Sequence, residues 1–236
     1  MILSIIQGVI VLVLYALGTA VIGIALAPSI LIFLKVLNAT LLWPQGLRAL
    51  ILGLTIAGGF FIFGLTLLVL VGFLNIIFNL RLKEGQYRFK DSEMLKWFFL
   101  NALVQGVKAF FMDFMILTPF ANIFYRMMGA KLGMNVQINS KNVADLSLLE
   151  IGNNSVIGGN ATVIAHIFER GGLKLKKVKI GSNVVVGLNA VIMPGCEIGD
   201  NAVIGAGAVL LRDTKVEARD VWVGIPAQSV RHKKEG

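Results

Sequence analysis

His166 is the residue of this sequence best suited to proton transfer. An imidazole takes up and releases a proton near neutral pH, so it can remove the proton of an attacking hydroxyl or amine. A neighbouring carboxylate commonly orients such a ring. Three carboxylates could do so here, and the sequence does not choose among them: Asp145, Glu150 and Glu169. The alternative is that His166 packs against Phe168 in a loop and takes no part in chemistry.

Basic side chains follow His166 closely. Ammonium and guanidinium groups suit phosphate, so the cluster could bind a phosphate group or an anionic acceptor; the alternative is a solvated surface. The residues expected to bind are Arg170, Lys174 and Lys176. The other histidine, His232, lies in a basic tail at 229–236, where we expect it to be solvated. Two histidines cannot supply a three-histidine zinc site, so we expect no metal.

These residues interrupt a pattern of six-residue steps. Each step opens on an aliphatic residue, and a small residue follows four positions later. The aliphatic positions are Ile151, Ile157, Val163, Ile180, Val186, Ile192, Ile198, Ile204 and Leu210. Such a step forms one short strand and one turn, and three steps close a triangular coil around the aliphatic side chains. The pattern predicts an all-β parallel β-helix over residues 131–228. We expect the glycines after the aliphatic residues, such as Gly152 and Gly158, to adopt turn conformations that a Cβ would penalise.

Two points of register affect the site. A weaker coil can be traced through Leu132 and Ile138, and Asp145 then stands where the next aliphatic residue is due. This placement indicates either a slip in register or a functional carboxylate. Val163 and Ile180 are one position closer together than a whole coil of three steps would place them. This spacing predicts that the insertion between them replaces about one turn of the prism.

The repeats resemble the left-handed parallel β-helix of the hexapeptide-repeat acyltransferases. The closing stretch VWVGIPAQSVR, residues 221–231, is similar to the G-x-P-A-x-x-x-R signature of members that use acetyl-CoA, although Gln228 stands where lysine is common. The resemblance implies a homotrimer, acyl-CoA in the cleft between two β-helices, and a histidine base on a loop. The cofactor-binding residues that it implies are Gly187, Gly205, Ala206, Gly207, Pro226, Ala227 and Arg231. The glycines among them would also suit the sterics of the coil alone.

The N-terminal part is apolar enough to span a membrane. The chain is 56% hydrophobic with a mean hydropathy of +0.80. No charged residue occurs in 1–34 or 49–80, and a helix of either length exceeds a hydrocarbon core of roughly 30 Å. We expect two transmembrane helices within 1–80, with Pro28 and Pro44 in the turn between them. A cleaved signal peptide fits poorly because no basic region precedes the apolar run.

Residues 81–130 join the two parts. We expect amphipathic helices at the membrane interface here, with Trp97 and Tyr125 at head-group level; the alternative is core helices of the following domain. Five basic residues follow the second apolar segment, and only Lys35 and Arg48 lie between the two segments. The positive-inside rule therefore places both termini and the β-helix in the cytoplasm, at a bacterial inner membrane. The charge of +9 shows no nucleic-acid pattern and suits anionic lipid.

A narrower resemblance includes the apolar segments. These segments, the stretch YRMMGAKLG and the residues 165–169, AHIFE, are similar to the C-terminal membrane modules of poly-amino-acid synthetases of the poly-lysine type. The expected function is transfer of an acetyl or other acyl group from acyl-CoA to a hydroxyl or amine, with His166 as general base. The acceptor would be a sugar, a lipid-linked saccharide or a peptide amine. The alternative is a non-catalytic trimeric scaffold or an auxiliary module of a larger membrane synthetase.

Overall fold

The computed structural model describes residues 2–88 and 90–230, and the chain forms two compact units. The first unit comprises residues 1–74 and 102–111, and the second comprises residues 75–101 and 112–236. Helix α3 (Ser92–Phe110) contributes its N-terminal half to the second unit and the rest to the first. Each unit is described by itself below.

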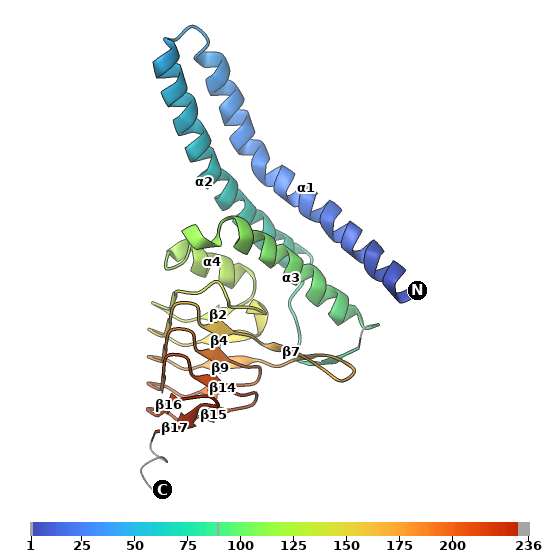
Figure 1. Ribbon diagram of the computed structural model, residues 1–236, viewed down its shortest axis with the longest axis vertical. Helices are drawn as coiled ribbons and strands as arrows, with labels where there is room; N and C mark the ends of the chain where they lie inside the picture. The colour runs from blue at the N-terminus through green and yellow to red at the C-terminus, as the bar shows by residue number, and fades with distance from the viewer. Residues whose placement is uncertain (1, 89, 231–236) are drawn as a thin grey trace. The chain divides into compact units, whose positions relative to one another are not determined.

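Two long helices, α1 (Ile2–Ala39) and α2 (Gln45–Ile77), make up most of the first unit. Both are long and apolar enough to cross a membrane. The Ser29 hydroxyl of α1 donates a hydrogen bond to the Gly59 carbonyl of α2 at 2.7 Å. A Cβ on Gly64 would lie inside the Phe111 ring, so this position of α2 accepts only glycine. The order of two apolar helices followed by a β domain, as predicted, is confirmed (Figure 1).

The turn between the helices is shorter than we expected. Pro28 lies inside α1, so the prediction that it marks the turn was wrong, and Lys35 also lies in α1. Pro44 does precede α2, and the Arg48 amide donates to the Pro44 carbonyl at 2.9 Å. A proline inside a helix removes one backbone hydrogen bond, which bends a long helix without ending it.

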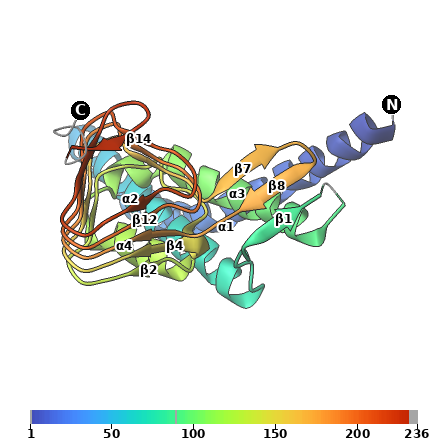
Figure 2. The ribbon, with the colours of Figure 1, turned by 90° about the horizontal axis from the view of Figure 1, so that it is seen from below.

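The second unit is built on a parallel β-helix with three faces (Figures 1 and 2). The first face contains β2 (Lys131–Leu132), β4 (Leu149–Ile151), β9 (Val178–Ile180), β12 (Glu197–Ile198) and β15 (Lys215–Val216). The second contains β3 (Gln137–Ile138), β5 (Val156–Ile157), β10 (Val185–Val186), β13 (Val203–Ile204), β16 (Val221–Val223) and β17 (Gln228–Ser229). The third contains β6 (Thr162–Val163), β11 (Val191–Ile192) and β14 (Val209–Leu210). The predicted β-helix, including its weaker first coil, is confirmed.

The interior of the prism follows the repeat. Aliphatic residues of successive coils pair in register, as Ile157, Val186 and Ile204 do on the second face, and each is at most 1% exposed. The small residues four positions later are fully buried from Ser155 to Ala208. Apolar area removed from water stabilises the fold by roughly 25 cal/mol per Å², so this continuous column is the main source of stability in this unit.

Most of the turns use asparagine in the left-handed conformation, where we expected glycine, while Gly195 and Gly207 adopt it in two others. The left-handed residue of each turn lies three positions after the aliphatic residue, and its φ is between 54° and 60° at Asn154, Asn160, Asn183, Asn189 and Asn201. Asparagine tolerates this conformation better than other residues with a Cβ. The glycines one position after the aliphatic residue have a different reason. A Cβ on Gly158 would lie 2.7 Å from the Val186 carbonyl oxygen of the next coil, so glycine is required there for close approach of the backbones.

The insertion adds to the β-helix and does not replace a turn of it. Ile180 pairs with Ile198 one regular coil of three steps later, as the repeat requires. The pairing of Ile151 with Ile180 also closes one coil, but nearly five steps of chain lie between these two residues. The coil that contains the insertion is therefore longer than a regular one, and the prediction that a turn is lost was wrong. The extra residues leave the prism at the corner between β6 and β9 and return to the same corner.

Short helices cover the first coil. They are η1 (Met112–Phe114), α4 (Pro119–Met127) and η2 (Leu146–Leu148). Asn122 donates to the Val136 carbonyl at 2.8 Å, and Arg126 donates to the Gly133 carbonyl at 2.8 Å. Trp97 and Tyr125 are 5% and 1% exposed, so their side chains are packed inside the protein, which does not favour the expected position at head-group level. The alternative, core helices of the following domain, fits these two residues.

Candidate active site

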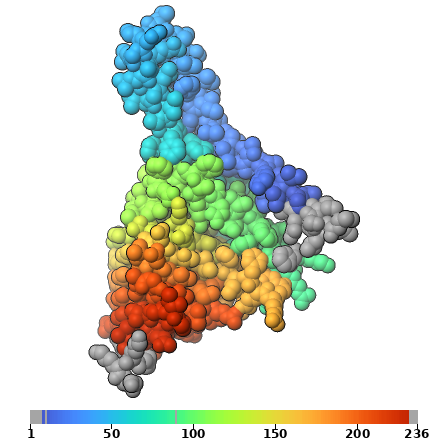
Figure 3. Space-filling model, viewed as in Figure 1, coloured from blue at the N-terminus to red at the C-terminus, as the bar shows by residue number. Residues whose placement is uncertain are grey.

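A three-stranded antiparallel sheet carries His166. Strands β7 (His166–Glu169) and β8 (Gly172–Leu175) form a hairpin from the inserted residues, and β1 (Gly85–Tyr87) pairs with β8. The sheet stands out from the stacked coils (Figure 2), and in the space-filling view the hairpin forms a lobe beside them (Figure 3, light orange). Gly172 has a φ of +155°, and a Cβ there would meet the Tyr87 carbonyl oxygen. The third strand therefore closes against the hairpin only because residue 172 is glycine.

Asp145 is the carboxylate that contacts His166. Its Oδ2 lies 2.6 Å from His166 Nδ1 and accepts a hydrogen bond from the Ala165 amide at 3.0 Å. Its Oδ1 accepts a hydrogen bond from the Trp97 indole N–H at 2.8 Å. The side chain of Asp145 is 4% exposed, and that of His166 is 23% exposed. A buried carboxylate with three donors is held in one orientation, and it leaves Nε2 of His166 as the nitrogen that can accept a proton.

The slip in register is what makes this contact possible. Val143 pairs with Val163 on the third face, so Val143 and not Asp145 occupies the interior position. Asp145 comes two residues later, in the left-handed conformation with φ 52° and ψ 46°, just before η2. The slip in register is therefore confirmed, and the freed carboxylate lies against the histidine, where its functional role stays a prediction.

The other two candidate carboxylates are engaged elsewhere. Glu169 forms an ion pair with Arg212. Glu150 forms ion pairs with Lys131 at 2.9 Å and Lys177 at 3.5 Å, and the hydrogen bond from Lys131 lowers the pKa of Glu150. Within residues 2–88 and 90–230, neither glutamate hydrogen-bonds to His166. Of the three candidate orienters, the structure brings only Asp145 to the ring.

The predicted binding residues of the hairpin do not form one cluster around His166. Cross-strand partners share a face of a sheet, and Lys174 pairs with Ile167 and Gln86, so Lys174 lies on the face opposite to His166. Lys176 forms an ion pair with Asp213 at 2.5 Å. Arg170 is exposed at the tip of the hairpin. Two ion pairs, Lys176–Asp213 and Arg212–Glu169, connect the hairpin to the turn after β14. These charged side chains therefore have a structural role.

The residues expected to bind the cofactor lie at another corner of the prism. Gly187 and Gly205–Gly207 follow β10 and β13, at the corner between the second and third faces, whereas the hairpin leaves the corner between the third and first. A Cβ on Gly187 would lie 2.5 Å from the Ala206 amide nitrogen, and Gly207 has a φ of +67°. Coil sterics alone therefore account for these two glycines. Pro226 is exposed and Ala227 is 8% exposed at the end of this column; Arg231 lies outside the described residues.

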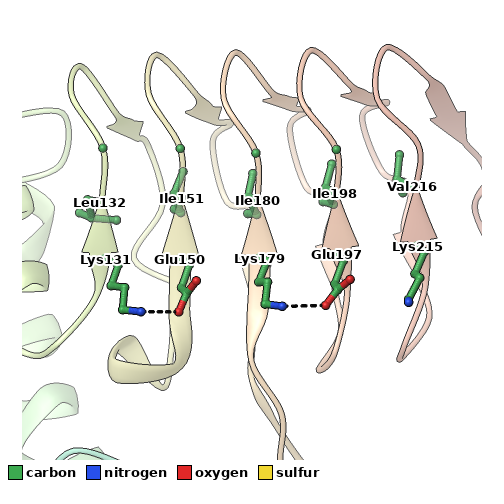
Figure 4. A pocket seen from close by; sticks show the side chains of 14 residues that line it. Lys131, Leu132, Glu150, Ile151, Lys179, Ile180, Glu197, Ile198, Lys215 and Val216 are labelled. Carbon is green, nitrogen blue, oxygen red and sulfur yellow. Dashed lines mark hydrogen bonds and ion pairs between the residues drawn. The ribbon is translucent and has the colours of Figure 1, made fainter.

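A charged ladder on the first face was not predicted. Lys131, Glu150, Lys179, Glu197 and Lys215 alternate in sign along adjacent strands and line an open groove of about 720 Å³ (Figure 4). Lys179 donates to Glu197 at 2.9 Å, and this hydrogen bond lowers the pKa of Glu197 and raises that of Lys179. The ladder could have been predicted from the sequence, since each of these charged residues directly precedes an aliphatic residue of the first face. Exposed pairs of this kind contribute little to stability, and neither His166 nor Asp145 lines the groove.

Two further features bear on the chemistry. Cys196 is fully buried, and burial raises the pKa of its thiol to about 11, so the residue is packing and not a nucleophile. In the part of the chain that the structure describes, no three His, Cys, Asp or Glu side chains lie together as a metal site would require.

Comparison with known proteins agrees with this fold. Residues 177–212 match the family model described as bacterial transferase hexapeptide (six repeats). These residues therefore carry hexapeptide repeats, and they lie in the left-handed parallel β-helix. It is also 22% identical, over 191 residues, to delta-poly-L-ornithine synthetase of Acinetobacter baumannii (strain AB307-0294). That match covers 78% of this chain but only 14% of the synthetase.

The solved structures that resemble part of this chain include two acetyltransferases. A maltose O-acetyltransferase of Clostridium difficile 630 is 23% identical with a TM-score of 0.46, over 64% of this chain and 93% of that one. A hexapeptide-repeat acetyltransferase of Vibrio cholerae O1 biovar eltor, complexed with acetyl coenzyme A, is 19% identical with a TM-score of 0.47, over 65% of this chain and 96% of that one.

Proposed function

We propose that this chain is a membrane-anchored acyltransferase that moves an acetyl or other acyl group from acyl-CoA to a hydroxyl or amine. The observation that carries the proposal is the contact between His166 Nδ1 and Asp145 Oδ2 at 2.6 Å, on a hairpin inserted into hexapeptide repeats. A buried carboxylate behind a partly exposed imidazole is the arrangement of a general base.

The proposed reaction is one direct transfer. Acyl-CoA supplies a thioester carbonyl as the electrophile. Nε2 of His166 takes the proton of the acceptor as its oxygen or nitrogen bonds to that carbonyl, and Asp145 stabilises the imidazolium that forms. When the carbon–sulfur bond breaks, the imidazolium returns its proton to the departing sulfur. The enzyme ends the cycle unchanged, and no covalent intermediate on the protein is needed.

The proposed site includes a second copy of the chain. His166 leaves the prism at one corner, whereas Gly205–Gly207 and Pro226 follow another. A β-helix is rigid along its whole length, so two of its corners cannot approach each other within one chain. Neighbouring copies in a trimer can place the hairpin of one chain beside the glycine column of the next. This supports a homotrimer with acyl-CoA held between chains by residues of the column, and the resemblance adds Arg231, which lies outside the described residues.

The proposed acceptor lies at the cytoplasmic surface of the membrane. Helix α2 ends at Ile77, and β1, which pairs with the His166 hairpin, begins eight residues later at Gly85. Eight residues span at most about 28 Å, so β1 stays within that distance of the end of an apolar helix. An acceptor that is itself held at the membrane, such as a lipid-linked saccharide or a peptide amine, would be within reach.

A second candidate function follows from the match to the synthetase. The 191 aligned residues make up most of this chain, and they form a small part of a much longer protein. In that case the chain would act as a module of a poly-amino-acid synthetase, and the β-helix would serve for assembly.

A single assay separates the two candidates. The full chain, purified in detergent or lipid nanodiscs, is given acetyl-CoA and a panel of sugar, lipid-linked saccharide and amine acceptors, and free CoA is measured. We expect acceptor-dependent release that falls by about 10²- to 10⁴-fold in His166→Ala, whereas His232→Ala keeps the activity. Release that survives His166→Ala would remove the base from the proposal. The absence of release with every acceptor would favour the assembly module.

A further inference from the structure

We propose that Trp97, on a helix that precedes the β-helix, is a positioning residue for the His166–Asp145 pair. The inference rests on the proposed function of His166 as the base. It places part of the active site in residues 81–130, a region in which the sequence indicated no site residue.

The indole N–H completes the set of donors around Asp145. Trp97 Nε1 donates to Oδ1 at 2.8 Å, while the Ala165 amide and His166 Nδ1 contact Oδ2. Each oxygen therefore has its own partners, and a rotation of the carboxylate would break all three contacts. A buried carboxylate held in this way keeps one oxygen facing the imidazole, which selects the tautomer with hydrogen on Nδ1.

The indole ring also limits where the imidazole can lie. The ring centroids of Trp97 and His166 are 4.9 Å apart with an interplanar angle of 61°, and those of Trp97 and Phe168 are 5.4 Å apart at 78°. His166 and Phe168 lie on the same face of the hairpin sheet, with Trp97 packed against both. Edge-to-face contacts of this kind favour one ring orientation over a rotated one.

Trp97 itself is firmly placed. It is 5% exposed, and its helical neighbours Met94 and Leu100 are 0% and 4% exposed. Glu93 and Lys96, in the preceding turn of α3, form an ion pair at 2.6 Å. The donor to Asp145 therefore comes from a packed helix and not from a mobile loop.

The experiment reads the tautomer of His166 directly by NMR of the full chain labelled with ¹⁵N-histidine, assigned with His232→Gln. Trp97→Phe keeps a ring in place and removes the N–H. We expect it to lower the fraction of His166 with hydrogen on Nδ1 and to lower kcat about 10-fold or more, with the KM for acetyl-CoA unchanged.

The β-helix offers a matched control. Trp222 donates from its indole N–H to Asp220 Oδ2 at 2.7 Å, near the last coil. Trp222→Phe removes the same kind of hydrogen bond, and we expect it to leave the His166 signals and kcat unchanged. A change of equal size in both variants would indicate general loosening of the domain and would overturn the proposal.

The outcomes separate this inference from the proposed function. If Trp97→Phe leaves the tautomer and kcat as in the wild type while His166→Ala abolishes transfer, the inference fails and the proposed function stands. If the tautomer shifts but the wild type transfers no acyl group to any acceptor, Trp97 positions the imidazole and the proposed function fails. If Trp97→Phe does not fold, the ¹⁵N indole signal of Trp97 is measured instead in the protein that keeps this tryptophan. That signal is assigned with variants that lack Trp43 or Trp222. We then expect it to move in Asp145→Asn, and an unmoved signal would overturn the inference.

Discussion

Asp145 meets His166 at 2.6 Å because Val143, two residues earlier, pairs with Val163 inside the β-helix. The slip moves the carboxylate from the interior of the prism to its corner, where the inserted hairpin begins. An interior carboxylate would have to be desolvated without a partner, which costs several kcal/mol. At the corner it has three donors instead.

The identity of the orienting carboxylate can be tested by three matched amide substitutions. We expect Asp145→Asn to lower kcat for acyl transfer by about 10-fold or more, because asparagine presents either an N–H or a weaker acceptor to Nδ1. Glu150→Gln and Glu169→Gln lose only ion pairs on the surface, and we expect less than about a 3-fold change. Steady-state kinetics with a fixed acceptor provides the comparison. A larger effect of either glutamine variant than of Asp145→Asn would contradict the assignment.

Neighbouring glycines should differ sharply in their tolerance of alanine. A Cβ on Gly158 would meet backbone atoms of the next coil at 2.7 to 2.9 Å, whereas one on Gly159 would meet the end of the flexible Leu188 side chain at 3.0 Å. We expect Gly158→Ala to reduce the free energy of unfolding by about 1–3 kcal/mol and Gly159→Ala by less than about 0.5 kcal/mol. Thermal unfolding of both variants in the same detergent tests the difference. Equal melting temperatures would mean that the coils are less tightly stacked than the structure shows.

The left-handed turn residues give a second test of the coil. Asn189 has a φ of 56° and an exposed side chain, so a substitution there acts mainly through the backbone. We expect Asn189→Val to reduce the free energy of unfolding by roughly 1–2 kcal/mol, and Asn189→Gly to change it little. The two variants are compared by chemical denaturation. A glycine variant as unstable as the valine variant would show that the asparagine side chain, and not its φ, matters.

Cys196 should be unreactive until the β-helix unfolds. Its buried thiol donates to the Leu211 carbonyl, and burial raises its pKa to about 11. We therefore expect a thiol reagent at pH 8 to modify the protein only in denaturant. The folded pKa exceeds the ordinary value of 9.0, so the folded state favours the neutral thiol, and stability should fall as pH rises from about 9 to about 11. Rapid labelling of the native protein would contradict this burial.

Membrane orientation can be read with single cysteines, since the native thiol is buried. Leu42 is 98% exposed in the turn between α1 and α2, and Arg170 is exposed at the tip of the hairpin. In a bacterial host, we expect Leu42→Cys to react with an impermeant reagent from outside the inner membrane. Arg170→Cys should react only after the membrane is opened. The reverse pattern would place the β-helix outside the cytoplasm.

Most of the fold could be predicted from the sequence because both of the sequence patterns that specify it are local. A six-residue period places one aliphatic side chain inward per strand, and the described coils from Ile151 to Leu210 follow it except where the insertion lengthens one of them. A long run without charge likewise specifies a long apolar helix through its own composition. The turns were misassigned to glycine because a glycine can serve either positive φ or close approach, and only the neighbouring coil shows which.

The candidate site depended on tertiary structure. The sequence by itself singled out His166 and three carboxylates, since residue types and the break in the repeat are visible in the chain. It did not distinguish Asp145 from Glu150 or Glu169, because that choice depends on the slip at Val143 and on the one coil that the insertion lengthens. Trp97 lies far from Asp145 in the sequence and could not be associated with it. A hydrogen bond over that separation exists only once a helix has packed against the corner of the prism.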